Sequence, residues 1–303
     1  MGGVMKKTYQ LIKARRSKIT ASRKSFQGFL WILPSFLGVM AFYLLPYADV
    51  VRRSFFGAVD NQCKGLENYR TVLENTAFLL AVKNTLRFTL CCIPALILTA
   101  LLCAVIIYRS KYGGVIKSAF LIPMALPAVS VALMWRLLFH SQGMVNHWLS
   151  RFSASGTDWM NDESAFWILV GSYLWKNLGY DIVLWMAGLS GISENIYEAA
   201  RVDGAGEWQC FFKITLPNLR SSFYTITVLS FLNSFKVFRE AYLVAGDYPH
   251  ESIYMMQHLF NNWFRSFSFD KMAAAAVLES LVLLLLILLF QRALERRNDG
   301  KEC

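Results

Sequence analysis

Long apolar blocks recur six times along the sequence and constrain its fold more than any other feature. Each block is about 18 to 25 residues long, the length of helix that crosses the roughly 30 Å hydrocarbon core of a bilayer. Hydrophobic residues make up 55% of the chain and charged residues only 17%, far from a soluble composition. The sequence therefore predicts an all-α, six-span membrane bundle. The expected spans are 29–51, 88–108, 119–139, 165–189, 223–245 and 272–290.

Basic residues are unevenly distributed between the two faces of this predicted bundle. An even number of spans places both termini on one face, and that face carries 18 of the 31 Lys and Arg residues. Because basic flanking residues are retained on the cytoplasmic side, we expect both termini and the 190–222 loop to be cytoplasmic. The net charge of +11 then reflects membrane topology and not nucleic-acid binding.

No linker, repeat or low-complexity tract divides the sequence, so a single membrane domain is expected. Residues 1–27 are predicted to be a basic cytoplasmic tail, 28–291 the six-helix domain and 292–303 a second cytoplasmic tail. The first apolar run is longer than a signal peptide's and lacks an A-x-A-like site, which indicates an uncleaved first span. Prolines at 94 and at 123 and 127 predict kinks in the second and third spans.

The cytoplasmic loop 190–222 has the pattern of a helix, a tight turn and a second helix. Ser193 or Asn195 can cap the first helix. The run Gly204-Ala205-Gly206 ends it, because glycine adopts the left-handed conformation that such a reversal requires. The second helix is expected to stop at Pro217.

Side chains of this loop suit an interaction with another protein. Small residues at the turn let a second backbone approach closely, and Glu198 and Asp203 offer carboxylates to a basic partner. Apolar residues give the second helix a stripe that is expected to pack against the spans. The stripe consists of Trp208, Phe211, Phe212, Ile214 and Leu216. A force applied at the turn would then reach the fourth and fifth spans.

This loop resembles the cytoplasmic loop of the permease subunits of ABC importers, most closely the carbohydrate-type branch. That branch has the pattern E-A-A-x-x-D-G-A followed by an F-x-x-I-x-L-P end. The characteristic positions correspond to Glu198, Ala199, Ala200, Asp203, Gly204, Ala205, Ile214, Leu216 and Pro217. Two departures stand out: Gly246-Asp247-Tyr248-Pro249 lacks the usual Gly-Gly-Pro run, and Ser193 replaces a common proline.

The resemblance implies a permease similar to those for maltose and glycerol 3-phosphate, in a bacterial or archaeal plasma (inner) membrane. Its implied partners are a second permease, expected to be a paralogue, two cytoplasmic ATP-binding subunits and an extracytoplasmic solute-binding protein. In that family the loop docks into a cleft of the ATPase, which makes Glu198 the acidic anchor and Gly204 the tight turn. The implied cargo is a sugar or oligosaccharide, with a polyol phosphate or another small solute as the alternative.

No catalytic, metal or cofactor site is expected in this chain. The segment Gly113-Gly114-Val115-Ile116-Lys117-Ser118 lacks the glycine that precedes lysine in a phosphate-binding loop. The four histidines fall in no metal or nucleophile spacing, and the six cysteines form no disulfide framework. ATP and Mg²⁺ are therefore expected on a partner ATPase, and this chain is not expected to be an enzyme.

Charged residues inside the predicted spans are candidates for a translocation path, because each is costly in hydrocarbon. The candidate path consists of Trp175, Lys176, Asn177, Tyr180, Asp181, Asn233 and Lys236. Its charged members could instead pair with one another or with the second permease. A different class, an ion-coupled transporter using Asp181 and Glu279, would predict inverted repeats, and none is visible in the sequence. A membrane enzyme would need a clustered catalytic set, which the sequence also lacks.

Overall fold

The computed structural model describes residues 31–58, 61–152 and 158–299. At 236, 238, 240 and 293–299 it describes the backbone without the side chains. The predicted tail 1–27 lies outside these ranges. All regular elements within them are helices, apart from one isolated bridge between Phe56 and Cys63. The all-α prediction is confirmed. The predicted C-terminal tail starts inside a helix, because α15 spans Phe269–Asp299.

Three of the described helices are long and apolar enough to cross a membrane. They are Trp31–Arg53, which includes η1 (Met40–Leu44) and α2 (Leu45–Arg53), together with α4 (Thr76–Tyr108) and α15. Helix α4 begins at Thr76, twelve residues before the predicted start of the second span at 88. Asn75 caps this helix: its side chain accepts a hydrogen bond from the Phe78 N–H at 3.0 Å. Beyond Pro94, α4 continues as one helix.

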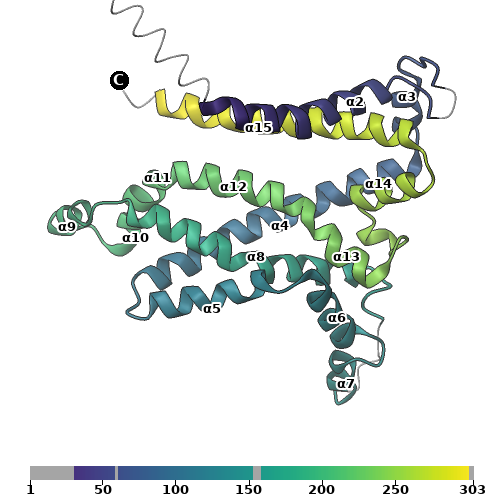
Figure 1. The fold of residues 1–303 in the computed structure, drawn as a ribbon. Coiled ribbons are helices and arrows are strands. Elements are labelled where there is room, and N and C mark those ends of the chain that lie inside the picture. Colours follow the sequence, from purple (N-terminus) through teal and green to yellow (C-terminus); the bar gives the residue numbers. More distant parts are fainter. Residues whose placement is uncertain (1–30, 59–60, 153–157, 300–303) are drawn as a thin grey trace, which may run out of the picture.

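The third predicted span, 119–139, is broken into two helices. They are α5 (Gly113–Ala125) and α6 (Ala128–Phe139), and the chain bends by 88° between them. Pro127 causes the break, since it has no N–H to donate and forces Leu126 into an extended conformation. Figure 1 shows α6 and the short α7 (Met144–Ser150) projecting away from the other helices.

The fourth and fifth predicted spans match described helices. The fourth is α8 (Ser164–Ser190), within a residue of the prediction at each end. The fifth is α12 (Arg220–Ser234), a 3₁₀ turn η3 (Phe235–Val237) and α13 (Phe238–Ala245). Neither of these two is among the three helices that are long and apolar enough to cross a membrane. If the bent α5–α6 pair is counted as one span, the described residues contain four candidate spans. The number of six spans therefore stays a prediction.

Helix α8 is the centre of the helical arrangement, where it packs against α4, α5 and α12. A Cβ at Gly179 of α8 would lie 1.9 Å from the carbonyl oxygen of Phe120, so α5 and α8 approach closely there. Two other residues of α8, Ile182 and Trp185, are buried and pack against side chains of α4.

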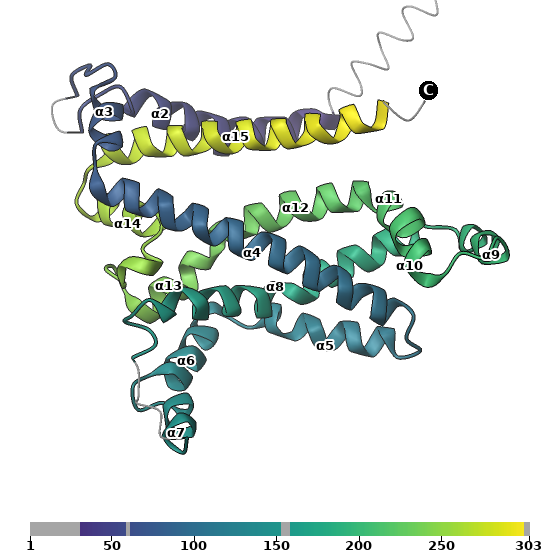
Figure 2. The same ribbon diagram turned by 180° about the vertical axis from the view of Figure 1, so that it is seen from behind.

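The outermost helices form a separate layer. Helix α2 lies along α15, and both lie to one side of the α4–α8–α12 group (Figure 2). Helices α3 (Glu67–Leu73) and α14 (Met256–Arg265) connect this layer to α4 at one end of the molecule, together with the turn η4 (Glu251–Ile253). No helix was expected between the fifth and sixth spans. Helix α14 forms there because Met256, Leu259 and Trp263 give it one apolar face, which is buried.

Candidate functional site

The predicted turn in the 190–222 loop has the expected backbone. Helix α9 (Glu194–Val202) is followed by Gly204 at φ +82°. The Gly204 N–H donates to the Arg201 carbonyl at 3.1 Å, and the Ala205 N–H donates to the Ala200 carbonyl at 2.9 Å. This pair of bonds is a Schellman motif, which satisfies the last carbonyls of α9 and fixes the reversal.

The start of α9 explains one departure from the family pattern. Ser193 is the N-cap residue at φ −65° and ψ 131°, and its side chain makes no capping hydrogen bond. This φ is the value to which a proline ring fixes the backbone. The serine therefore holds the conformation that the more common proline would impose.

The surface of α9 is open to a partner. None of its residues is buried, and the helix projects at the end of the molecule opposite α3 (Figure 1). Glu198, Ala199, Asp203 and Gly204 are exposed, while Ala200 and Ala205 are half-buried. Within the described part of the chain, the carboxylates of Glu198 and Asp203 make neither an ion pair nor a hydrogen bond. These two acids are therefore available to a basic partner.

The second helix of the loop ends at Asn218, one residue beyond Pro217. It comprises α10 (Glu207–Cys210), a π-helical turn η2 (Phe211–Thr215) and α11 (Leu216–Asn218), and only Leu219 separates it from α12. Pro217 follows the π-helical turn, in the last residues of this helix. The predicted end of this helix agrees with the structure to within one residue. Beyond it, the single residue Leu219 leads into α12.

The predicted apolar stripe is only partly packed. Phe211 contacts the core beside α4 and α8, and Ile214 is half-buried. Trp208 and Phe212 are 77% and 57% exposed and stack on each other with ring centroids 6.2 Å apart; Leu216 is exposed as well. One side of this helix therefore packs against the bundle, and the other side exposes aromatic side chains beside α9.

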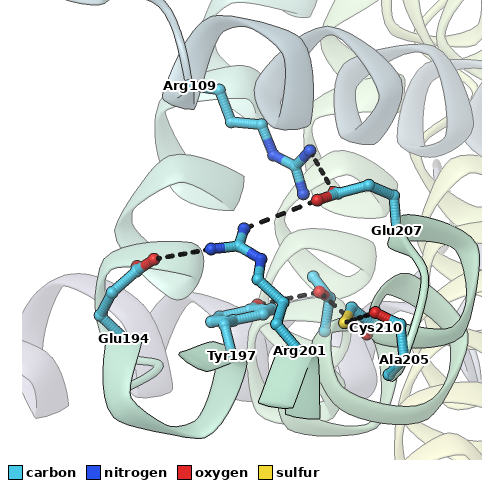
Figure 3. Close-up of polar contacts among 8 residues, drawn as sticks. Arg109, Glu194, Tyr197, Arg201, Ala205, Glu207 and Cys210 are labelled. Atoms are coloured by element: carbon cyan, nitrogen blue, oxygen red, sulfur yellow. Dashed lines mark hydrogen bonds and ion pairs between the residues drawn. The ribbon is translucent and has the colours of Figure 1, made fainter. Parts of the chain in front are cut away.

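An ion-pair network ties α9 and α10 to the end of α4 (Figure 3). Glu207 lies between two arginines: Nη1 of Arg109 is 2.5 Å from one of its carboxylate oxygens, and Nη2 of Arg201 is 3.5 Å from the other. Arg201 also reaches Glu194 at 4.0 Å. The hydrogen bond from Arg109, with its charge, holds the pKa of Glu207 below its usual value. Nothing in the sequence pattern indicated this network, because Arg109 lies in a different loop.

Two further contacts join the helices of the loop. The hydroxyl groups of Tyr197 and Thr215 are 2.9 Å apart, linking α9 to η2, and the Thr215 side chain is buried. The Cys210 thiol lies 3.9 Å from the carbonyl oxygen of Ala205. The loop is thus held as one unit between its turn and the spans.

A cavity of about 330 Å³ lies where the α5–α6 break and the α12–α13 region face α8. We call it the central cavity. Its lining is Met124, Leu126, Pro127 and Ala128 from the α5–α6 break, Ser172, Tyr173, Lys176 and Asn177 from α8, and Asn233, Val237 and Arg239 from the α12–α13 region.

Three residues of the predicted path, Lys176, Asn177 and Asn233, line the central cavity. Trp175 packs edge-on against Trp135 of α6, with ring centroids 5.9 Å apart. Tyr180 is not among the lining residues, and the side chain of Lys236 lies outside the described part. The prediction missed Ser172, Tyr173 and Arg239.

The structure corrects the expectation for Asp181, which does not line the cavity. Its side chain is 1% exposed, and it accepts a hydrogen bond of 2.8 Å from the Ser230 hydroxyl. Tyr173 donates from its hydroxyl to the Ser230 carbonyl, also at 2.8 Å. Within the described part of the chain Asp181 forms no ion pair. It therefore joins α8 to α12 instead of facing a solute.

Comparison with known proteins identifies the family. The family described as "Binding-protein-dependent transport system inner membrane component" matches residues 96–300. The chain belongs to this family. It is therefore a multi-pass membrane component of a transport system, a permease and not an enzyme.

Curated relatives of this permease cover most of its length. It is 30% identical to the arabinooligosaccharides transport system permease protein AraP of Bacillus subtilis, over 73% of this chain and 72% of the relative. It is 28% identical to the trehalose/maltose transport system permease protein MalF of Thermococcus litoralis, over 91% and 96%. It is 26% identical to the sn-glycerol-3-phosphate transport system permease protein UgpA of an Escherichia coli strain, over 93% and 99%.

Solved structures support the same fold for the permease. A chain in the crystal structure of a bacterial ABC transporter that imports the acidic polysaccharide alginate superposes with a TM-score of 0.78. The two sequences are 21% identical, and the match covers 90% of this permease and 96% of that chain. The resemblance to importer permeases is thus confirmed by both sequence and fold.

Proposed function

We propose that this permease pairs with a second permease, a paralogue, to form the path of an ATP-driven importer for a sugar or oligosaccharide. An extracytoplasmic solute-binding protein delivers the solute. Two cytoplasmic ATP-binding subunits hold the ATP and Mg²⁺, and this chain binds no cofactor of its own. Both termini and the α9 turn face the cytoplasm of a bacterium or archaeon, as the distribution of basic residues favours.

The names of the relatives support the solute class. Relatives are described as carrying arabinooligosaccharides, trehalose or maltose, and lactose. Others are described as carrying sn-glycerol 3-phosphate or a sulfoquinovosyl glycerol, which keeps a polyol phosphate or a related solute as the alternative. A second structure of the alginate importer contains a periplasmic protein with bound alginate pentasaccharide, which supports delivery by a binding protein.

The exposed turn after α9 carries the proposal for ATPase coupling. It presents the carboxylates of Glu198 and Asp203, which pair with no described residue, on and just after a helix that has no buried residue. The same unit is tied to α4 through the Arg109–Glu207 ion pair and leads into α12. A displacement of the docked ATPase would therefore move α4 and α12 together, and α12 ends at the central cavity.

Replacing the acidic anchor tests this proposal. The complete importer, purified with its partner subunits, is reconstituted in vesicles, and uptake and ATP hydrolysis are measured with its binding protein present. The Glu198→Gln variant is expected to insert normally but to lose most of the uptake per ATP hydrolysed, because a charge-assisted contact is removed. The control is Glu67→Gln, the same change at an exposed position in α3, at the opposite end of the molecule (Figure 1).

Two outcomes would refute the proposal. One is that no ATP-binding subunit accompanies the chain on purification from its native membrane. The other is that Glu198→Gln and Glu67→Gln both retain wild-type uptake and wild-type coupling.

A further inference from the structure

The charged side chains that line the central cavity are basic. Lys176 and Arg239 are the two charged residues among its described lining residues, and the remaining polar ones, Ser172, Tyr173, Asn177 and Asn233, are neutral. The nearest buried acid on α8, Asp181, bonds to Ser230 instead and is absent from the lining. The described lining of the cavity therefore contains two cations and no acid.

A neutral sugar gives no reason for such a charge. Hydroxyl groups and sugar ring faces are recognised by neutral hydrogen-bonding groups and aromatic rings, whereas a cation placed in a membrane domain is costly and usually has a role. The side chain of Arg239 is exposed at the cavity, in the first turn of α13, where the helix dipole repels a cation. Within the described part of the chain Arg239 has no ion pair and no hydrogen bond. No described side chain accounts for its position.

A buried hydroxyl group also faces the cavity without a partner. Ser172 is 3% exposed and lines the cavity, and its hydroxyl makes no hydrogen bond to the described residues. Buried polar groups are normally hydrogen-bonded, so one that opens onto a cavity indicates a ligand there.

Backbone donors lie at the same place. Helix α6 begins at the cavity with Ala128, and its N-cap is Pro127, whose side chain cannot accept from the first N–H groups. A helix N-terminus with free N–H groups favours an anion. The cationic side chain, the buried hydroxyl and these N–H groups are all donors, which matches an acceptor-only group.

We propose that the central cavity selects an anionic solute, a saccharide or polyol that carries a carboxylate, phosphate or sulfonate group, and that Arg239 binds this group. This inference rests on the proposed function and narrows its solute class. Arg239 is then a specificity-determining residue of the path, with the Ser172 hydroxyl as a second donor.

The test uses the complete importer with its own binding protein. The compound that elutes from the denatured binding protein is identified by mass spectrometry, and its charge at pH 7 is the first readout. The second readout is the ATP-dependent uptake of that compound into vesicles at saturating binding protein. Variants are Arg239→Gln, Arg239→Lys and, as a control, Arg136→Gln, which removes a cation from an exposed position of α6 that does not line the cavity.

We expect an anionic compound, and uptake by Arg239→Gln about tenfold or more slower than wild type, the effect of losing one charged hydrogen bond. Arg239→Lys should retain most uptake, and Arg136→Gln should match wild type. A neutral or cationic compound would overturn the inference, as would unchanged uptake by Arg239→Gln. If Arg239→Gln does not assemble into the importer, the inference is still tested by the charge of the eluted compound and by the uptake of the Arg239→Lys variant. Neutral cargo with ATP-dependent uptake refutes only this inference, whereas uptake that needs neither ATP nor binding protein refutes the proposed function.

Discussion

Replacing Gly204 by alanine should loosen the α9 turn without unfolding the bundle. Gly204 has φ +82°, and a Cβ there would have no neighbouring atom within 4 Å, so the cost is conformational and not steric. A left-handed conformation costs an L-residue about 1–2 kcal/mol. Because α9 has no buried residue to compensate, the ratio of formed to open turns should fall about 5- to 30-fold.

Hydrogen exchange measures this change directly. The Ala205 amide, which donates to the Ala200 carbonyl at 2.9 Å, should exchange faster by about the same 5- to 30-fold, and uptake per ATP should fall with it. Gly204→Asn should recover part of both, since asparagine tolerates a positive φ better than alanine. Gly206→Ala is the matched control, because Gly206 has φ −75° and equally open space around a Cβ.

The reasoning would be refuted if Gly204→Ala and Gly206→Ala gave the same exchange rate at Ala205 and the same coupling. The left-handed turn would then contribute nothing to holding the loop. Faster exchange at Ala205 with unchanged uptake per ATP would support the structural role of the turn and refute only its role in coupling.

Three further predictions concern other contacts. Reversing the charge of either Arg109 or Glu207 should lower uptake per ATP. The double swap Arg109→Glu with Glu207→Arg should restore only part of it, because it re-forms the pair between positions 109 and 207 but places a cation beside Arg201; a double swap as poor as the single changes would contradict this. Gly179→Ala should lower the melting temperature of the purified importer, because overpacking costs about 1–3 kcal/mol, whereas Gly171→Ala on the same helix, where a Cβ has open space, should not. Burial lowers the pKa of His258 from 6.5 to about 4. The unfolded chain therefore binds a proton that the folded chain excludes, and stability should fall between pH 6.5 and 4 by an amount on the order of 3 kcal/mol; thermal unfolding of His258→Gln should lack that decline.

Much of the local structure could be predicted from the sequence. The period and length of the apolar blocks predicted α8 within a residue, and Gly204 predicted the left-handed turn, because both depend on nearby residues. Pro127 predicted a kink, but the 88° break exceeds what the local pattern indicated. Pro217 predicted the end of the second helix of the loop to within one residue, because a proline inside a helix disrupts its hydrogen bonds.

The polar sites show the limit of that approach. Asp181 was expected on the path because buried charge indicates function, but the structure pairs it with Ser230, 49 residues away. Arg239 was not predicted for the path, since its place on the cavity depends on how α13 packs against α6 and on where the fifth span breaks.

The sequence by itself determined the membrane character of this permease, its helices and the left-handed turn after α9. These features follow from hydrophobicity and backbone preference over a few consecutive residues. Only the tertiary structure decided which charges meet: it brought Arg109 to Glu207 and placed Arg239 at the central cavity. Such contacts join residues of different helices, and they depend on how those helices pack and where they break.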